Sequence, residues 1–529
     1  MSLYTEKDII LLSSNWENIM KEVEEQKYLM IEPSKEEMIS VHKIICDFVK
    51  EHKRKIYGGF GLNLLVKEKS PKEAIYKEGS IADIDFYSPH PIIDLIKLCN
   101  ILHNKGFKGV IGREAQHQET YNITVNYLTY CDISYVPKNI YDKMPFKEIE
   151  NYIVIHPHFM WIDYLRMFTD PLISYWRMND DLKSFKRFFL LQKYFKFPKN
   201  DYPIEIEDST KELDLILSEI FKFITDNKTT LTVGFYAYNY FLNESGLLNN
   251  KQNNRQSNTQ SNLKLVNIPY FEIISTRYRE DCLQLLYDLS QIPLINQSKL
   301  THQEFYPFFQ FTDHSVEIYY DGDIVAKIYN HNRKCIPYID VPAIDFSQTN
   351  LINSTKSTKS TNSVIRLATF PTVLSFSIIS IMKARTQSND DDKNLHYAMT
   401  SHLIEMRKYY FLKNKKTMLD NSVFREFTAK CMGDTIPPDR QRKLLIESRK
   451  KKNKKWIFSY EPSEGIKDPE STYLFANTSG NKIINTKNLK LSIVKPEDDI
   501  EGDFDEEGLD EKIGGSTNQP GSTDQAKFK

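Results

Sequence analysis

The sequence predicts an α+β protein in which a small mixed sheet flanked by helices is followed by a second lobe. Short β-branched and aromatic runs alternate with helical patterns between residues 55 and 136. From about 156 to 222, apolar residues recur with the helical period. Residues 233–242 then resemble residues 57–65. Because 529 residues exceed the size of a single ordinary core, we expect this second pattern to belong to another domain.

Changes in composition divide the chain into four parts. We expect an N-terminal helical segment at 1–50 and an α/β domain with trailing helices at 51–225. A C-terminal lobe should occupy 226–460. The remaining residues, 461–529, should form an irregular to disordered tail that is acidic at 497–511.

The cysteines and the apolar runs limit where the protein can act. Six cysteines are scattered without a CxxC pair, which argues against a zinc module and a disulfide framework and favours a reducing compartment. The N-terminal MSLYTEKDIILL has no basic stretch before an apolar core, so we expect no secretory signal. The run at 367–382 is too short and too rich in Ser and Thr to span a bilayer.

Two acidic side chains alternate along the segment DIDFYS at 83–88. Side chains two apart in a strand point to the same face, so Asp83 and Asp85 should project together. Carboxylates held this close repel each other, and divalent cations that prefer oxygen ligands relieve the repulsion. Taken alone, the pair is more often a solvated strand edge.

A third acid stands in a second strand-like segment, YCDISYV at 130–136. If this strand lies beside the first, Asp132 joins the acidic pair. Three carboxylates on two strands can hold two Mg²⁺ ions about 3.5–4 Å apart, which is the arrangement for in-line attack on a phosphate. Cys131 should point to the opposite face and belong to the core.

Two adjacent glycines, Gly58 and Gly59, lie where a strand turns into a helix in IYGGFGLNLLV. Without side chains, the backbone N–H groups and the helix N-terminus can approach a triphosphate. A tight turn without a ligand would use the same residues. The combination with the three downstream acids makes the pattern specific.

This combination resembles the nucleotidyltransferase superfamily of DNA polymerase beta, in which a glycine turn precedes an acidic pair and a third acid on a later strand. The matching positions are Gly58, Gly59, Asp83, Asp85 and Asp132. The superfamily pattern covers about 55–135. Over about 40–440, the chain also resembles the poly(A) polymerase catalytic subunits of nucleocytoplasmic large DNA viruses, mimivirus-like forms included. The segments that carry this resemblance are YGGFGLNLL, ADIDFYSPHP and WRMNDDLKSFKRFFLLQKY.

The resemblance implies a polymerase-beta-like catalytic domain at 51–225 and a template-independent polynucleotide adenylyltransferase. Such an enzyme adds AMP from ATP to the 3′ end of viral mRNA with two Mg²⁺ or Mn²⁺ ions. Asp83, Asp85 and Asp132 would be the metal ligands, and Asp132 would activate the 3′-OH. Gly58 and Gly59 would hold the triphosphate. The implied location is the host cytoplasm (the viral factory) and the virion, without membrane contact, and the implied partner is a second copy of the chain or a stimulatory subunit.

Two other classes of function remain open. The same site could serve uridylyl transfer, CCA addition or oligoadenylate synthesis, because only base selection and the acceptor differ. A nucleic-acid-binding scaffold with a dead active site would also keep the fold. The presence of all three acids argues against the scaffold.

Basic residues extend the prediction toward nucleotide and RNA. The helical segment 176–195 carries a basic rim that could meet the triphosphate or the RNA backbone, and Asp180 and Asp181 could equally balance it as a solvated face. The nucleotide-binding candidates on this rim are Arg177, Lys183, Lys186 and Arg187. A second run precedes Trp456, whose ring could stack on a base. Its RNA-binding candidates are Arg449, Lys450, Lys451, Lys452, Lys454 and Lys455. This run could also be a localisation signal or a solvated face. His156 and His158 more often serve packing than metal binding.

A faint internal repeat characterises the second lobe. Gly234 aligns with Gly58 and Asn239 with Asn63, whereas Phe235 replaces the second glycine. Further along, Asp83 becomes Tyr270 and Asp85 becomes Glu272. A copy that keeps the packing residues and loses the carboxylates would be a structural or binding domain. Chance similarity between two strand–helix units is the alternative.

Overall fold

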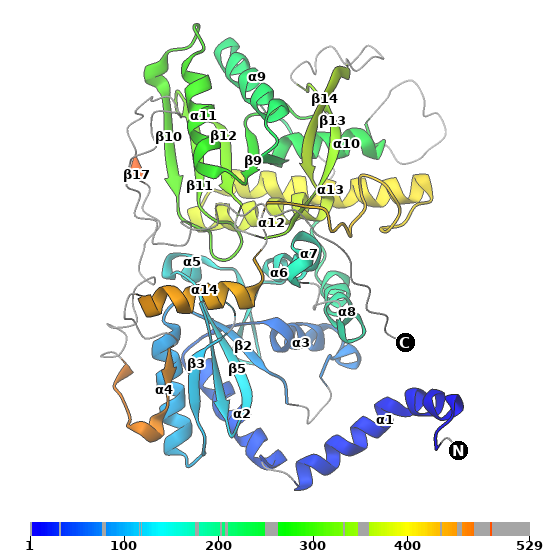
Figure 1. Cartoon of the computed structure of the whole chain (residues 1–529), viewed down its shortest axis with the longest axis vertical. Helices are drawn as coiled ribbons and strands as arrows, with labels where there is room; N and C mark the ends of the chain where they lie inside the picture. The colour runs from blue at the N-terminus through cyan, green and yellow to red at the C-terminus, as the bar shows by residue number, and fades with distance from the viewer. Residues whose placement is uncertain are drawn as a thin grey trace, which may run out of the picture.

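The protein folds into two lobes, each built around a mixed sheet (Figure 1). The computed structural model describes residues 3–30, 33–76, 81–115, 117, 119–174, 179–200, 204–206, 210–248, 263–331, 334–346, 359–433, 436–451, 458–469 and 487–488. Each sheet is covered by helices, which confirms the predicted α+β class.

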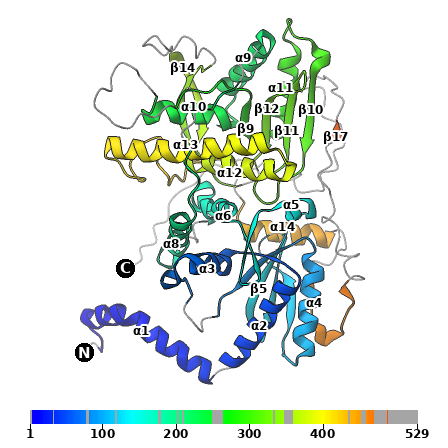
Figure 2. The same cartoon turned by 180° about the vertical axis from the view of Figure 1, so that it is seen from behind.

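The first lobe follows the alternation predicted between 55 and 136. Its elements are α2 (Lys35–Glu51), β1 (Lys55–Tyr57), α3 (Gly58–Lys69), η1 (Pro71–Glu73), β2 (Ile84–Ser88), α4 (Pro91–Asn104), β3 (Ile111–Glu114), β4 (Thr120–Val125), β5 (Leu128–Tyr135), α5 (Lys138–Lys143), β6 (Phe146–Ile149), β7 (Tyr152–Ile155), α6 (Pro157–Thr169), α7 (Pro171–Ser174) and α8 (Asn179–Tyr194). Among the described residues, the strand order is β16-β3-β4-β5-β2-β1-β7-β6. Seen from behind, α2 and α4 cover one face of this sheet (Figure 2).

Local sequence explains where these helices begin. Ser34 caps α2, because its hydroxyl accepts the backbone N–H of Glu37. Pro91 and Pro157 stand at the first positions of α4 and α6, where a missing N–H costs nothing. Apolar side chains of α2 and α4 pack on the buried residues of β2 and β5 and form the core of the lobe.

The second lobe repeats the strand arrangement of the first. Its elements are α9 (Lys211–Asp226), β8 (Thr230–Val233), α10 (Gly234–Ser245), β9 (Phe271–Ser275), α11 (Tyr278–Ser290), η3 (Gln297–Lys299), β10 (Leu300–Phe305), β11 (Ser315–Tyr320), β12 (Asp323–Asn330), β13 (Ile336–Ile344), β14 (Lys359–Ala368), α12 (Phe370–Gln387), α13 (Asp390–Asn414) and β15 (Cys431–Met432). The order β10-β11-β12-β9-β8 matches β3-β4-β5-β2-β1, with the same parallel pair at its centre. The predicted repeat is therefore confirmed in strand order and pairing.

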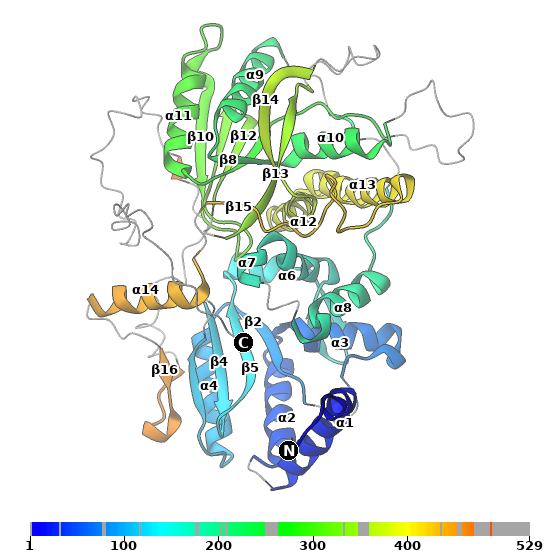
Figure 3. The same cartoon turned by 45° about the vertical axis from the view of Figure 1, so that its right-hand side comes forward.

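The lobes meet through helices and aromatic side chains. Helix α6 of the first lobe packs against α12, which runs along the lower edge of the second lobe (Figure 3). Tyr87 of β2 meets Phe309 edge-on, with ring centroids 5.4 Å apart. Asp170, at the end of α6, accepts the backbone N–H of Cys335 at 3.1 Å. The junction thus joins the acidic strand β2 to the second lobe.

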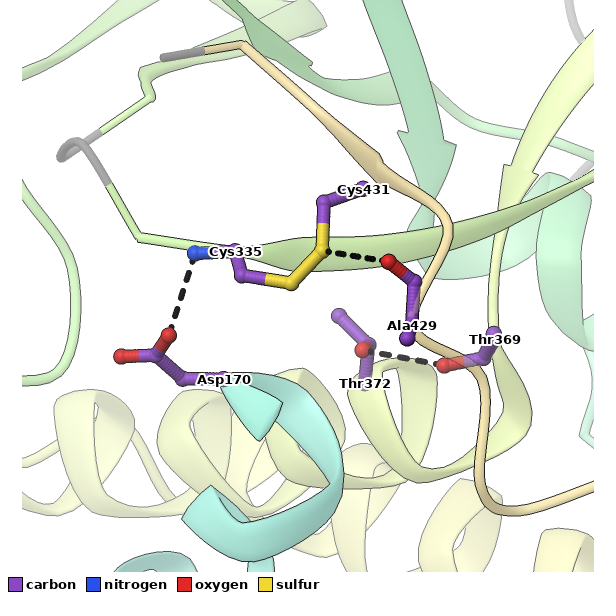
Figure 4. The surroundings of a disulfide bond; sticks show 6 residues. All are labelled: Asp170, Cys335, Thr369, Thr372, Ala429 and Cys431. Carbon is purple, nitrogen blue, oxygen red and sulfur yellow. Dashed lines mark hydrogen bonds between the residues drawn. A yellow bond between two sulfur atoms is a disulfide. The ribbon is translucent and has the colours of Figure 1, made fainter. Parts of the chain in front are cut away.

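A disulfide joins Cys335 to Cys431 beside this junction (Figure 4). The sequence predicted no disulfide framework, and this single bridge departs from that expectation. The two cysteines are 96 residues apart, and the pairing of β13 with β15 brings their Cα atoms to 5.1 Å. The spacing of the cysteines along the chain does not predict this disulfide. The other four cysteines are buried and unbridged.

The chain returns to the first lobe after completing the second. Helix α14 (Pro438–Lys451) lies against the first lobe, and β16 (Ser459–Tyr460) adds to β3 at the edge of its sheet (Figure 3). The sequence-based division placed 226–460 in the C-terminal lobe, so this returning segment crosses the predicted boundary. Of the predicted tail, the structure describes only 461–469, which includes η5 (Pro462–Glu464), and β17 (Lys487–Asn488).

The N-terminal helical segment comprises two helices with different surroundings. Helix α2 packs on the first sheet, whereas α1 (Glu6–Met30) projects away from the body of the lobe (Figures 1 and 2). Several apolar side chains of α1 face solvent, Ile10 and Trp16 among them. In the described part of the chain, every helix is too short or too polar to cross a bilayer.

Candidate active site

The two acidic strands lie side by side, as predicted. Strand β2 runs parallel to β5, and Asp85 is the register partner of Asp132. Asp83 directly precedes β2, so the two-residue spacing places it on the same side as Asp85. On the other flank, β1 pairs antiparallel to β2 with Tyr57 opposite Asp85. Acids 47 residues apart in the chain thus become neighbours in the sheet.

All three acids line one small cavity of about 130 Å³. Its full lining is Gly59, Tyr76, Asp83, Asp85, Thr129, Cys131, Asp132, Lys183 and Arg187. Asp83 is exposed, whereas Asp85 and Asp132 are half-buried. Cys131 is fully buried, as its predicted core position requires, and still contributes to the cavity wall.

The glycine turn shapes this cavity in two different ways. Gly58 begins α3 with φ at +66°, a conformation that a side chain disfavours, and a Cβ there would overlap Oδ2 of Asp85. Gly58 therefore makes room for the Asp85 carboxylate itself. Gly59 faces the cavity, where a Cβ would lie 2.5 Å from the Tyr76 hydroxyl and 2.9 Å from Nη1 of Arg187. The missing side chain of Gly59 therefore lets the Tyr76 phenol and the Arg187 guanidinium approach the N-terminus of α3.

Burial raises the pKa of all three acids, and repulsion between carboxylates adds to this effect for Asp85 and Asp132. Burial, together with the charges of Asp132 and Asp83, raises the pKa of Asp85 well above its ordinary value. Burial and the charge of Asp83 raise the pKa of Asp132 to about 6. Burial also raises the pKa of Asp83, although Lys183 and Arg187 act in the opposite direction. The site therefore favours binding of positive charge.

Divalent cations fit this donor set. Carboxylate oxygens are hard ligands of the kind that Mg²⁺ prefers, and their coupled repulsion would be relieved by a cation in the cavity. As the side chains stand, no three acidic, histidine or cysteine residues in the described ranges lie close enough together to enclose an ion. The predicted convergence of the three acids on shared cations therefore stays a prediction.

Helix α8 brings two of the predicted basic residues to the cavity. Lys183 and Arg187 are one helical turn apart and both line it. Lys186 is exposed on the same helix and does not line the cavity. Arg177 lies outside the described residues. The structure thus joins the acids with two of the four cations predicted for nucleotide binding.

The sequence did not single out Tyr76, which also lines the cavity. Its hydroxyl accepts a hydrogen bond from Nη2 of Arg187 at 3.0 Å. Asn63 of α3 fixes its backbone, because Oδ1 accepts the N–H groups of Ile75 at 2.8 Å and Tyr76 at 3.1 Å. A signal existed in Asn63, since a buried amide in a helix must find partners elsewhere.

The basic run after 448 lies away from this cavity. Arg449 forms a two-pronged ion pair with Glu114 at the end of β3, with N···O distances of 2.7 and 3.2 Å. Its guanidinium therefore docks α14 on the first sheet. Lys450 and Lys451 are exposed at the end of α14. The candidates Lys452, Lys454 and Lys455 lie outside the described residues.

The two histidines of IHPHF are packing residues in the structure. Nδ1 of His156 accepts the backbone N–H of His158 at 3.1 Å and caps α6. His158 stacks on Phe197 with ring centroids 3.9 Å apart. Burial lowers the pKa of His156 to about 3 and that of His158 to about 4, so both are neutral near pH 7.

The corresponding position in the second lobe carries a lysine where the first lobe has its third acid. Glu272 pairs in register with Lys327, as Asp85 does with Asp132. Lys327 Nζ lies 3.9 Å from Oε1 of Glu272 and 4.0 Å from Oε1 of Glu317, and 4.4 Å above the ring of Tyr270. The ammonium group of Lys327 therefore supplies positive charge beside the carboxylates of Glu272 and Glu317.

Comparisons with known proteins agree with this geometry. Residues 43–174 match the family model of the poly(A) polymerase catalytic subunit, and 207–493 match that of the C-terminal part of the mimivirus (APMV) poly(A) polymerase catalytic subunit. A protein of Acanthamoeba polyphaga mimivirus assigned as such a subunit is 33% identical over 506 residues, which span 93% of this chain and 85% of the relative.

Two further relatives define the reach of the similarity. An African swine fever virus protein with the same assignment is 29% identical over 182 residues, 32% of this chain and 37% of the relative. The crystal structure of the Megavirus polyadenylate synthase superposes with a TM-score of 0.77 at 30% identity, and covers 92% of this chain and 94% of that one. The solved structure thus matches both lobes, whereas the more distant sequence matches a third of the chain.

Proposed function

The chain belongs to the poly(A) polymerase catalytic subunits, nucleotidyltransferases that add poly(A), and we propose that it transfers AMP from ATP to the 3′ end of viral mRNA at the cavity of Asp83, Asp85 and Asp132. The observation that carries the proposal is the register of β2 and β5. It sets Asp85 beside Asp132 on a cavity that Lys183 and Arg187 also line.

Asp83, Asp85 and Asp132 would hold two Mg²⁺ or Mn²⁺ ions. When bound, the cations supply positive charge that favours ionisation of the primer hydroxyl and stabilises the leaving pyrophosphate. The support for this assignment is the hard oxygen donor set, the burial that raises the pKa values of all three acids, and the repulsion that raises those of Asp85 and Asp132 further.

The chain's own residues divide the remaining work. Asp132 accepts the proton as the primer 3′ oxygen bonds to the α-phosphorus of ATP, and the bond to the β-phosphate oxygen breaks to release pyrophosphate. Lys183 and Arg187 line the same cavity as the acids and neutralise the phosphates. Gly59 lets the Arg187 guanidinium lie against the N-terminus of α3, which favours the same anion.

Extension of a short oligo(A) primer with each nucleoside triphosphate separately tests this function. Adenylyl transfer predicts long products with ATP and little with UTP, CTP or GTP. Preferential use of UTP, or addition of only CCA, would assign the site to another nucleotidyltransferase. Binding of ATP with Mg²⁺ but no extension with any nucleotide would identify a scaffold.

The matching relatives are virus proteins, which supports action in the host cytoplasm and the virion. RNA and ATP are the partners that the reaction requires. A second copy of the chain or a stimulatory subunit would supply processivity. Light scattering on the purified chain, with and without RNA, distinguishes a self-paired enzyme from one that needs another subunit.

A further inference from the structure

Tyr76 occupies a defined place in the candidate active site that none of the predicted roles explains. It follows η1, and Asn63 holds its backbone from inside α3, the helix that begins with the two glycines. Asn63 is itself buried, with 9% of its surface exposed. The tyrosine is therefore tied to the helix whose N-terminus opens on the cavity.

The side chains of Tyr76 and Arg187 contact each other and both lie close to the backbone of Gly59. The Tyr76 hydroxyl lies 3.0 Å from Nη2 of Arg187, and the guanidinium carbon is 5.7 Å from the centre of the tyrosine ring. A Cβ on Gly59 would meet both the hydroxyl and Nη1 of Arg187. Because Gly59 has no side chain, the phenol and the cation pack directly against the N-terminus of α3, and all three line the cavity, where together they suit a phosphate.

Arg187 is incompletely satisfied where it stands. In the described part of the chain, its buried Nε has no hydrogen-bond partner. A buried donor without a partner indicates a ligand or a rearrangement that the free site does not supply. The hydrogen bond to Tyr76 fixes one edge of the guanidinium and leaves Nη1 toward Gly59.

We propose that Tyr76 is a positioning residue, which orients the Arg187 guanidinium over Gly59 to bind the triphosphate of the incoming nucleotide. The proposal rests on the proposed function and deepens it. It assigns the tyrosine–arginine pair to the nucleotide and not to the RNA backbone, because the pair lies at the α3 N-terminus on the same cavity as the acids. A tyrosine that only filled space would not need its hydroxyl.

A double-mutant cycle on the full chain tests this role. The variants are Tyr76→Phe, Arg187→Lys and the double variant, each assayed for primer extension. We expect Tyr76→Phe to raise KM for ATP roughly five- to tenfold, with kcat within about twofold and KM for the primer unchanged. In the Arg187→Lys background, Tyr76→Phe should add no further change, because it acts through the arginine fork. Tyr270→Phe is the matched control, since its hydroxyl bonds Lys327 at 3.2 Å in the second lobe.

Three results would overturn the proposal. They are an unchanged KM for ATP in Tyr76→Phe, an equal fold-change in both backgrounds, and a loss of kcat that follows a lowered melting temperature. Equilibrium binding of a fluorescent ATP analogue gives the same comparison without turnover. If the wild-type chain extended no primer, the proposed function would fail, whereas a tighter Kd in the wild type than in Tyr76→Phe would still support the tyrosine's role.

Discussion

The two lobes share a scaffold and differ in charge at its centre. Each has a strand, a glycine turn and a helix, followed by a strand that pairs antiparallel to the first. Gly58 and Gly234 adopt φ values of +66° and +65°, and each leaves space for a carboxylate, of Asp85 or of Glu272. The glycine turn therefore follows the fold and the packing of an acidic side chain, and does not by itself indicate catalysis.

A buried hydrogen bond between a serine and an aspartate, which we call the brace, is also common to both lobes. In the first, Ser88 donates to Asp94 and accepts the backbone N–H of His90 at 2.9 Å. In the second, Ser275 donates to Asp281 and accepts the N–H of Arg277 at the same distance. These contacts close the turn between the acidic strand and the following helix, so the fold at this turn is the same in both lobes although the charges at the centre of the sheet differ.

The two lobes differ at the residue that pairs with the carboxylate of the acidic strand. This residue is Asp132 opposite Asp85 and Lys327 opposite Glu272. Asp132 adds a third repelling charge, and the first lobe keeps an open cavity beside it. Lys327 instead neutralises Glu272 and Glu317 within the chain. The comparison teaches that one substitution, of acid by lysine, satisfies internally a charge that the first lobe leaves for a ligand.

The largest effect should come from removing an acid on one lobe only. Asp132→Asn should lower kcat for primer extension on the order of 10³-fold, because the cavity would lose the proposed proton acceptor and metal ligand. Glu272→Gln, its counterpart control in the second lobe, should leave kcat within a few-fold. Comparable losses in both variants would mean that both lobes take part in catalysis.

Adding a methyl group to either glycine turn should cost stability in both lobes and activity in one. Gly58→Ala and Gly234→Ala should each lower the free energy of unfolding by about 2–3 kcal/mol, from positive φ and overlap with a carboxylate. Only Gly58→Ala should also displace Asp85 and reduce kcat. Urea denaturation and primer extension measure the two effects, and an active, stable Gly58→Ala would contradict the geometry of the turn.

The brace should matter equally on both sides. Ser88→Ala and Ser275→Ala should each destabilise their lobe by about 1–2 kcal/mol, because a buried aspartate loses a hydrogen-bond donor. Thermal unfolding should show similar shifts for the two variants. A shift in one alone would show that the repeated contacts are not equivalent.

The smallest effect concerns pH in metal-free buffer. Since the pKa of Asp132 is raised to about 6, the folded state holds this proton more tightly than the unfolded state, and the group's stabilisation declines as pH rises from about 4 to 6. Asp132→Asn should therefore become more stable than the wild type by roughly 1 kcal/mol above pH 6. Melting temperatures from pH 4 to 7 test this difference. Added Mg²⁺ should reduce it, and a pH-independent gap would contradict it.

The sequence was most informative where chemistry and periodicity coincide. Alternation placed Asp83 and Asp85 together, and the strand pattern around Asp132 predicted its neighbour. The structure explains why Asn63 and Asn239 are aligned in the repeat. Each buried side-chain amide forms hydrogen bonds with the backbone of the segment that follows its own helix. Residues under strict local constraints therefore leave a readable trace.

The sequence was least informative about contacts between distant segments. The backbone of Tyr76 is held by the side chain of Asn63 in α3, and the spacing of residues along the chain does not predict this contact. Lys327 could be matched to Asp132 only once the strand registers were known. The Cys335–Cys431 bridge likewise depends on the pairing of β13 with β15. Each of these requires the tertiary structure itself.

The return of the chain to β3 has a consequence for how the protein is made. Glu114 and Arg449 are 335 residues apart, so the ribosome must synthesise the whole second lobe before the first acquires its last strand. At 5–20 residues per second, that delay is roughly 20–70 s. During this interval the nascent sheet presents an open edge, which is a template for pairing with another nascent chain. This edge of β3 therefore stays unpaired until β16 has been synthesised.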